Sequence, residues 1–96
     1  MSESPLKTRL IVNPKAGAGR AGRRLDALRQ AVDAAIPNAE IRVTEAPGHA
    51  RHLAKQAAEE GVQVLAAVGG DGTVHEVVDG LFDNDRPRAP DLILGV

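Results

Sequence analysis

The sequence predicts a three-layer α/β/α sandwich built around a parallel sheet. Apolar strand-like runs alternate with amphipathic helical segments along the 96 residues, at about 30 residues per unit. Such alternation requires crossover connections, which give a parallel sheet with helices on both faces. Glycine-rich stretches follow the first and third runs, at the edge where open α/β sheets bind ligands.

The first half of the chain predicts two strands and one helix. The apolar-rich run 6–12 predicts the first strand, and residues 13–20 predict a glycine-rich loop. Apolar residues recur at helical spacing over 25–36, and Pro37 ends that helix because proline cannot continue the hydrogen-bonded ladder. Residues 41–44 predict the second strand.

The middle of the chain predicts a helix followed by a central strand. Small and apolar residues over 50–58 indicate a second helix, which Gly61 closes. Residues 62–68 form a short, nearly continuous apolar run. We expect such a run in a parallel strand that is covered on both faces.

The remaining segment predicts a third helix and a fourth strand. From Thr73 onward, apolar residues fall at positions i, i+3, i+4 and i+7, which form one stripe of a helix. Residues 83–88 predict a polar link, and the apolar run 92–96 predicts a strand. We expect the loop after that strand to belong to a longer protein, of which this chain is a fragment.

Composition excludes several classes of protein. The chain has no cysteine, which rules out disulfides and thiolate metal sites. Phe82 is the only aromatic residue, so the core must be aliphatic, and nucleobase stacking and a nucleic acid partner are not expected. No apolar run approaches the roughly 20 residues of a membrane span, and no secretory signal is evident. We expect a cytoplasmic protein.

The charges are distributed unevenly along the chain. Residues 7–29 hold seven Lys/Arg against Asp26, a net charge of +6, whereas residues 56–96 hold eight Asp/Glu against two arginines, a net charge of −6. The basic segment could attract a polyphosphate or an anionic membrane surface. Equally, Arg23, Arg24 and Arg29 could be the solvated face of the first helix.

The stretch 69–73 is the strongest functional signal. Gly69, Gly70 and Gly72 let the main chain approach a ligand closely, and a helix N-terminus follows with free N–H groups that suit phosphate. Asp71 lies between glycines and has no evident role as a cap or in the core. We expect Asp71 to bind Mg²⁺ or to remove a proton.

The loop after the first strand is a second candidate phosphate site. Gly17, Gly19 and Gly22 formally match a dinucleotide-binding G-x-G-x-x-G pattern, but four residues separate Val12 from the first of these glycines. A P-loop also fails, because arginines stand where that motif needs Lys and Ser/Thr. What remains is a glycine loop with free amides, flanked by Lys15 and Arg20 and expected beside the Asp71 loop. It could also be only a flexible turn.

Other polar residues have simpler interpretations. Thr73 and Glu76 have the spacing of a capping box, a role that is compatible with a functional one. His49 and His75 lack a third nitrogen or sulfur ligand at zinc spacing, and His52 is expected on the surface.

Three blocks of the sequence, residues 13–19, Thr44 with residues 48–50, and residues 69–81, form a recognisable set in this order. Together they resemble the diacylglycerol kinase catalytic domain superfamily, which includes bacterial lipid kinases, sphingosine kinases and ceramide kinases. Residues 13–19 resemble its N-P-x-A-G-x-G loop, Thr44 with residues 48–50 resembles its T-x-x-x-G-H-A block, and residues 69–81 resemble its G-G-D-G-T-x-x-E-x-x-x-G-L signature. His75 and Asp79 stand where many relatives carry asparagine.

The resemblance implies an ATP-dependent lipid kinase that uses Mg²⁺, with a diacylglycerol-like or sphingoid acceptor. Residues 1–96 would be the N-terminal, ATP-binding part, and the lipid would be held by a β-rich domain outside this chain. The resemblance assigns catalysis, and a direct or water-mediated Mg²⁺ contact, to Asp71. The nucleotide-binding residues that we expect are Asn13, Pro14, Lys15, Gly17, Gly19, Arg20, Thr44, Gly69, Gly70, Gly72, Thr73 and Glu76.

Two other functions fit part of the sequence. An NAD kinase shares the G-G-D-G tetrad but not the Asn13-Pro14 block, and a nucleotide- or polyphosphate-binding module would need no catalysis. For a lipid kinase we expect transient contact with a membrane surface, and a homodimer is compatible with the resemblance. We expect the isolated chain to have weak or no kinase activity.

Overall fold

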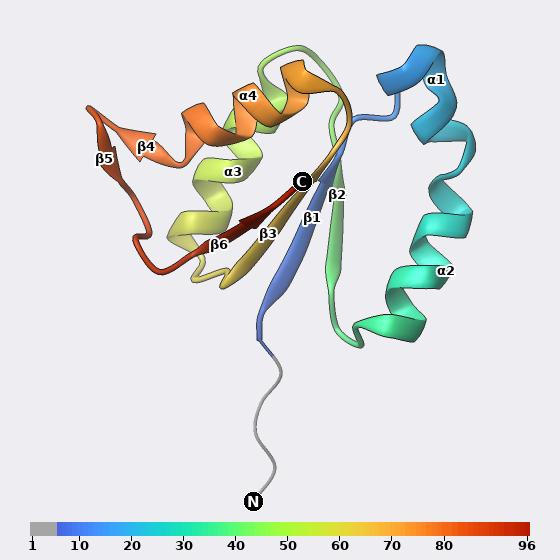
Figure 1. Cartoon of the computed structure of the whole chain (residues 1–96), viewed down its shortest axis with the longest axis horizontal. Coiled ribbons are helices and arrows are strands. Elements are labelled where there is room, and N and C mark those ends of the chain that lie inside the picture. The colour runs from blue at the N-terminus through green and yellow to red at the C-terminus, as the bar shows by residue number, and fades with distance from the viewer. Residues whose placement is uncertain (1–5) are drawn as a thin grey trace, which may run out of the picture.

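A computed structural model describes residues 6–96 and has the predicted three-layer α/β/α architecture (Figure 1). The start of the expected domain, residues 1–5, lies outside the described residues. The parallel sheet has the order β2-β1-β3-β6. Its strands are β1 (Thr8–Val12), β2 (Glu40–Val43), β3 (Val64–Val68) and β6 (Ile93–Gly95). The helices are α1 (Ala16–Arg23), α2 (Leu25–Ala35), α3 (His49–Glu59) and α4 (Asp71–Gly80).

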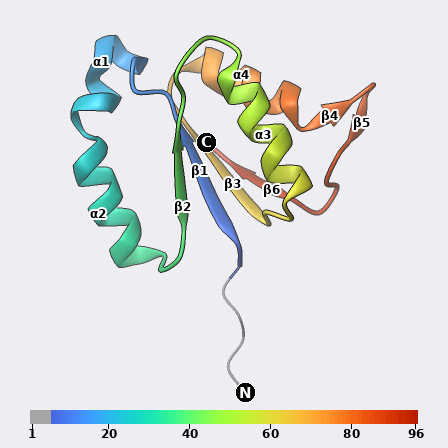
Figure 2. The same ribbon diagram turned by 180° about the vertical axis from the view of Figure 1, so that it is seen from behind.

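The helices cover the two faces of the sheet unequally. Figures 1 and 2, which are opposite views, both place α2 on one side of the strands and the pair α3 and α4 on the other. Side chains along each strand alternate between the two cores. On β1, Ile11 packs toward α3 and α4, whereas Leu10 and Val12 pack toward α2. On β3, Leu65 and Ala66 divide in the same way, which confirms a central strand that is covered on both faces.

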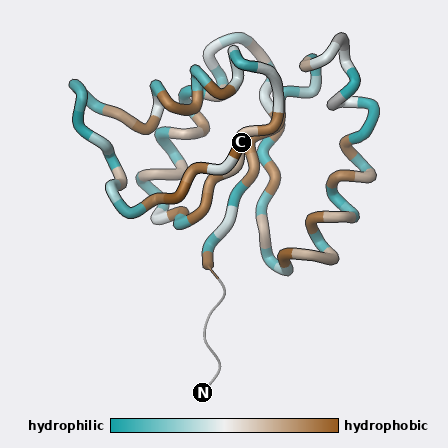
Figure 3. Tube along the Cα trace, in the orientation of Figure 1, coloured by the Kyte–Doolittle hydropathy of each residue, from teal (hydrophilic) through white to brown (hydrophobic). Residues whose placement is uncertain are grey.

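The core is entirely aliphatic, as the composition predicted. Its buried apolar residues are all Leu, Ile, Val or Ala, and the largest fully buried ones include Ile11, Leu65 and Val77. Burial of each such side chain contributes about 1.5–3 kcal/mol. Phe82, the only aromatic residue, is 44% exposed. Figure 3 colours the chain by hydropathy, with brown, hydrophobic positions along β6 and teal, hydrophilic positions at the tip of the hairpin that precedes it.

Helices α3 and α4 cross closely because α4 has a glycine, Gly80, at the crossing. A Cβ at Gly80 would collide with the backbone carbonyl of Arg51, so only glycine fits there. Gly61 follows α3 with a φ of 77°, the left-handed conformation that commonly ends a helix. No helix within residues 6–96 has both the length and the apolar character needed to cross a bilayer.

Several predicted element boundaries were wrong. Residues 16–20 were expected in a loop but belong to α1, so two helices stand where one was predicted. The polar link 83–88 contributes instead to an antiparallel hairpin of β4 (Phe82–Asp83) and β5 (Arg86–Pro87), whose turn places Asn84 and Asp85 at positive φ. The strands expected over 6–12, 62–68 and 92–96 are shorter than predicted.

One buried cation ties strands and a helix end together. Arg9 on β1 is 3% exposed, and its Nη2 lies 2.8 Å from Glu40 Oε1 and 2.7 Å from Glu60 Oε1. Burial opposes the charge of Arg9, but the hydrogen bonds with Glu60 and Glu40 outweigh it and raise the pKa of the guanidinium. The bond from Arg9 lowers the pKa of both carboxyl groups below their ordinary value. The cluster therefore stays ionised at neutral pH.

Candidate functional site

The carboxyl ends of three neighbouring strands bring the predicted site residues together. Backbone hydrogen bonds continue past the strands, from Asn13 N to Val68 O at 2.9 Å and from Thr44 N to Val12 O at 2.8 Å. Because β1 is parallel to both of its neighbours, β2 and β3, the segments that leave all three strands share one edge of the sheet. This is the edge where the sequence predicted ligand binding.

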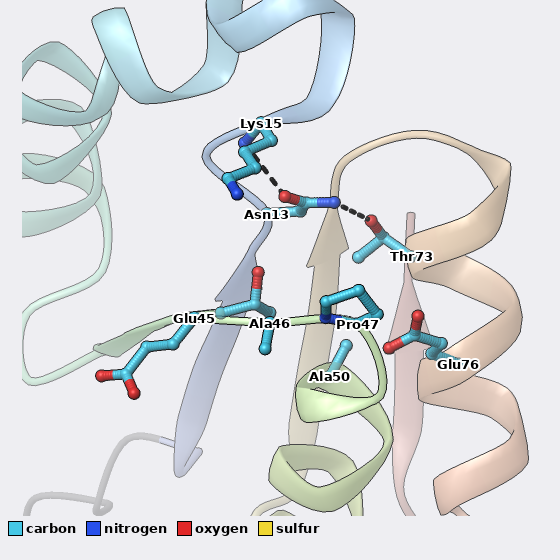
Figure 4. A pocket seen from close by; sticks show the side chains of 9 residues that line it. Asn13, Lys15, Glu45, Ala46, Pro47, Ala50, Thr73 and Glu76 are labelled. Atoms are coloured by element: carbon cyan, nitrogen blue, oxygen red, sulfur yellow. Dashed lines mark hydrogen bonds between the residues drawn. The ribbon is translucent and has the colours of Figure 1, made fainter.

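Asn13 links the first of these segments to α4. Its Oδ1 accepts from Lys15 N at 3.0 Å, and its Nδ2 donates to Thr73 Oγ1 at 3.2 Å (Figure 4). Thr73 is only 4% exposed, so its hydroxyl needs a partner inside the protein. The single amide of Asn13 thus fixes both the turn after β1 and the start of α4.

A pocket of about 210 Å³ opens between these segments. Five predicted residues line it: Asn13, Lys15, Thr44, Thr73 and Glu76. The other lining residues, which sequence reasoning did not select, are Glu45, Ala46, Pro47 and Ala50. Three of them are the variable positions of the T-x-x-x-G-H-A block, which carried no chemical signal of their own, and Ala50 is the last residue of that block.

A second hollow lies between α1 and the start of α4. It measures about 410 Å³ and is lined by Ala16, Gly17, Arg20, Arg24, Val68, Gly69 and Gly70. The first glycine stretch therefore lies beside the Gly69–Gly70 turn, as the sequence predicted. Arg24 was considered as part of a solvated helix face, yet it borders this hollow with Arg20. The two arginines give the hollow a positive charge.

The first glycine stretch is an irregular helix rather than a loop with free amides. Gly17 and Gly19 have φ of 62° and 86°, which a residue with a Cβ rarely adopts. The amides of Gly19 and Gly22 donate to Lys15 O and Pro14 O, so those donors are already used. A Cβ at Gly22 would lie 2.8 Å from Pro14 O. These glycines are therefore explained by the fold of α1 and its packing on Pro14.

The second glycine stretch joins β3 directly to α4. The helix begins at Asp71, not at Thr73 as predicted, so Asp71 and Gly72 form its first turn. The predicted capping box is wrong, because Gly70 is the N-cap and no side chain bonds there. A Cβ at Gly69 would lie 2.5 Å from Thr73 Oγ1, whereas one at Gly70 or Gly72 would meet nothing within 4 Å.

Asp71 is exposed at the start of α4 and lines neither hollow. The first N–H groups of a helix have no partner within it, and they give its N-terminus a partial positive charge. Within residues 6–96, no three His, Cys, Asp or Glu side chains gather closely enough to hold a metal ion. Asp71 is a single exposed carboxylate beside the Gly69–Gly70 turn, and it could serve as one ligand of a metal ion.

Glu76 and His49 both contact the segment between β2 and α3. Glu76 Oε1 accepts from Gly48 N at 3.1 Å, and His49 Nδ1 accepts from Glu45 N at 2.9 Å. Figure 4 shows the Glu76 carboxylate on the Pro47 side of α4, while the Glu45 carboxylate extends away from the other side chains. His52 is exposed, as predicted.

Comparison with known proteins gives a consistent family. The sequence profile of the diacylglycerol kinase catalytic domain matches residues 7–96. The chain is 36% identical over 80 residues to a diacylglycerol kinase of Bacillus subtilis, which covers 83% of this chain and 26% of that protein. It is 34% identical over 83 residues to human sphingosine kinase 1, covering 82% of this chain and 21% of that one.

A solved structure agrees in fold as well as in sequence. A diacylglycerol kinase from Bacillus anthracis superposes with a TM-score of 0.69 at 36% identity, covering 83% of this chain and 29% of the other. The chain thus spans 21–29% of the length of these three relatives.

Proposed function

The chain belongs to the diacylglycerol kinase catalytic domain family, a family of lipid kinases, and we propose that it forms the ATP-binding half of an enzyme that phosphorylates a lipid hydroxyl. The relatives include a diacylglycerol kinase and a sphingosine kinase, so the acceptor we propose is a diacylglycerol-like or sphingoid lipid. In this proposal, residues 1–96 are the N-terminal part, and a β-rich domain outside the chain holds the lipid. The enzyme would act in the cytoplasm and contact the membrane surface transiently.

One observation carries the proposal: a pocket and a cationic hollow lie side by side at the carboxyl edge of the sheet. The 210 Å³ pocket is smaller than the roughly 300 Å³ at which ligand sites usually begin, so a nucleotide would need both spaces. Its phosphates would lie over the N-terminus of α4, near Lys15 and Arg20. Helix N-termini and arginine side chains are suited to phosphate.

The glycines of the second junction support this placement. Gly70 and Gly72 have open space around the position of a Cβ, and neither has a positive φ, so the fold itself does not require glycine there. A helix position such as that of Gly72 is normally more stable with alanine, by about 0.5–1 kcal/mol. Gly70 is the N-cap of α4, where glycine is itself favoured over alanine, so Gly72 carries more of this support. Close approach of a phosphate to the backbone would explain why this chain has glycine there.

Asp71 is the residue to which we assign the chemistry. Phosphoryl transfer depends mainly on the position of the hydroxyl and on neutralisation of phosphate charge. Asp71 would orient the lipid hydroxyl as a general base, or would hold Mg²⁺ directly or through water. Mg²⁺ is commonly bound by one or two carboxylates together with substrate phosphates, which fits a lone exposed aspartate. The bound ion would neutralise charge on the transferring phosphate.

The test is substitution of Asp71 in the complete kinase. We expect Asp71→Asn to lower kcat by about 10²–10⁴, the usual contribution of a positioned acid–base group. Asp79→Asn is the matched control, because Asp79 is also exposed on α4 but only pairs with Arg51 at 3.5 Å. Diacylglycerol, sphingosine and NAD would be offered in parallel as acceptors. Normal turnover by Asp71→Asn would refute both roles, and turnover of NAD alone would refute the lipid assignment.

The isolated chain gives a second test. Residues 1–96 should bind ATP weakly and phosphorylate lipid weakly or not at all, because the acceptor site would be absent. Efficient lipid phosphorylation by this chain alone would contradict the proposed division into two parts.

A further inference from the structure

The segment between β2 and α3 forms one wall of the pocket but belongs to neither element. Thr44, Glu45, Ala46 and Pro47 all line the pocket, and α3 begins only at His49. We call residues 44–48 the wall loop. A wall built from such a segment has a defined shape only if specific contacts hold it, because connecting segments are more mobile than the elements they join.

His49 holds the start of the wall loop through its ring. Its Nδ1 accepts the Glu45 N–H at 2.9 Å. This hydrogen bond joins the two ends of the turn formed by Ala46, Pro47 and Gly48. Nδ1 can accept this N–H only through its lone pair, so the contact depends on an acceptor atom at that position. The backbone N–H of His49 also donates, to Ala46 O at 3.1 Å. His49 therefore contacts the wall loop at two points.

A second anchor holds the far end of the wall loop. Gly48 has a φ of 86°, and its N–H donates to Glu76 Oε1 at 3.1 Å. Glu76 lies one helical turn after Thr73, which is itself bonded to Asn13. The wall loop is thus connected to α4 and, through Asn13, to the turn after β1. All three segments around the pocket belong to one hydrogen-bonded network.

We infer that His49 is a positioning residue for the occupant of the pocket: its imidazole fixes the wall loop without itself lining the pocket. The inference rests on the proposed function for the identity of the occupant, which we take as ATP. His49 acts on the Glu45 backbone, and the Glu45 carboxylate points away from the other lining side chains (Figure 4). The required property is an acceptor atom at the Nδ1 position rather than an imidazole as such.

Three substitutions separate this role from a general structural one. His49→Asn places a carbonyl oxygen the same number of bonds from the main chain as Nδ1, and can therefore accept the Glu45 N–H. His49→Gln places its oxygen one bond farther, and His49→Ala has no acceptor. Thermal unfolding of each variant of the 96-residue chain shows whether it is folded.

Two measurements on folded variants test the inference. We expect hydrogen exchange of the Glu45 amide to become about tenfold faster in His49→Ala and His49→Gln, and to stay near the wild-type rate in His49→Asn. The affinity for ATP should fall several-fold in His49→Ala and His49→Gln and should stay near the wild-type value in His49→Asn. In the complete kinase, the same pattern should appear in KM for ATP with little change in kcat.

The outcomes separate this inference from the proposed function. Faster exchange at Glu45 with unchanged ATP affinity would overturn the positioning role, as would equal loss of affinity in His49→Asn and His49→Ala. If the wild-type chain and the complete protein both fail to bind ATP, the proposed function fails. The exchange measurement then still decides whether His49 orders the wall loop, and unchanged exchange in His49→Ala would overturn that.

Discussion

The two glycine-rich junctions lie side by side, yet their glycines have different causes. In the first, after β1, Gly17 and Gly19 adopt positive φ and Gly22 packs against Pro14 O. In the second, after β3, only Gly69 is required by its neighbours, because a Cβ there would strike the Thr73 side chain. Gly70 and Gly72 have negative or extended φ and open surroundings.

This difference separates glycines that the backbone conformation or packing requires from glycines that leave open space beside the main chain. The backbone of α1 cannot be formed without residues that tolerate left-handed conformations. At the start of α4, by contrast, alanine would fit sterically at two of three positions. The second junction is therefore the place where a requirement from outside the described chain, such as a phosphate, best explains the sequence.

The largest expected effect is that of Gly69→Ala. The added Cβ would lie 2.5 Å from Thr73 Oγ1 and 2.8 Å from Thr73 Cβ, so the buried threonine must move and its bond with Asn13 must break. We expect a loss of about 1–3 kcal/mol in the free energy of unfolding, measured by urea denaturation. The matched control is Gly70→Ala, where a Cβ meets nothing and the loss should stay below about 1 kcal/mol. Equal losses would show that the contrast within this junction is wrong.

A smaller effect of opposite sign is expected for Gly72→Ala. Because Gly72 lies in the first turn of α4 with space around it, alanine should raise the free energy of unfolding by about 0.5–1 kcal/mol. Gly17→Ala, also within a helix but at a φ of 62°, should lower it by about 1–2 kcal/mol.

The affinity for ATP completes that comparison. Under the proposed function, Gly72→Ala should bind ATP more weakly although it is more stable, whereas any loss of affinity in Gly17→Ala should accompany a loss of stability. Isothermal titration of both folded variants would measure this. Gly72→Ala with undiminished ATP affinity would remove the argument that an external ligand explains this glycine.

The sequence predicted the architecture well because its signals were local. Alternating apolar runs, the proline after the first predicted helix and the lone aromatic residue were sufficient for the sandwich and its aliphatic core, both of which the structure confirms. The helical character of residues 16–20 was missed, because glycine in a helix is normally unfavourable and here left-handed residues are built into it.

The candidate site was only partly readable from sequence. Asn13, Thr44, Thr73 and Glu76 were selected from motifs, and the structure places all four around one pocket, while their roles toward a nucleotide stay predictions. The contact of His49 with Glu45 N could not be predicted, because it depends on how the wall loop folds back toward α3. The capping box failed for a related reason: Thr73 and Glu76 bond to other segments instead of to their own helix end.

The smallest expected effect is the loss of stability at low pH, and it provides a reference against which the variants in both junctions can be compared. Arg9 hydrogen bonds lower the pKa of Glu40 and Glu60, so their pairing stabilises the fold above the ordinary glutamate pKa and is lost as pH falls through the lowered values. The urea midpoint should therefore drop as the pH is lowered from about 5 to about 3, and this drop should be smaller in Arg9→Met, which lacks the pairing. Because Arg9, Glu40 and Glu60 contact neither junction, the acid-induced drop in the urea midpoint should be the same in wild type, Gly69→Ala and Gly72→Ala.

A larger drop in Gly69→Ala alone would mean that the junction after β3 is coupled to the ion pairs of β1. Its glycines could then not be considered separately from the rest of the sheet.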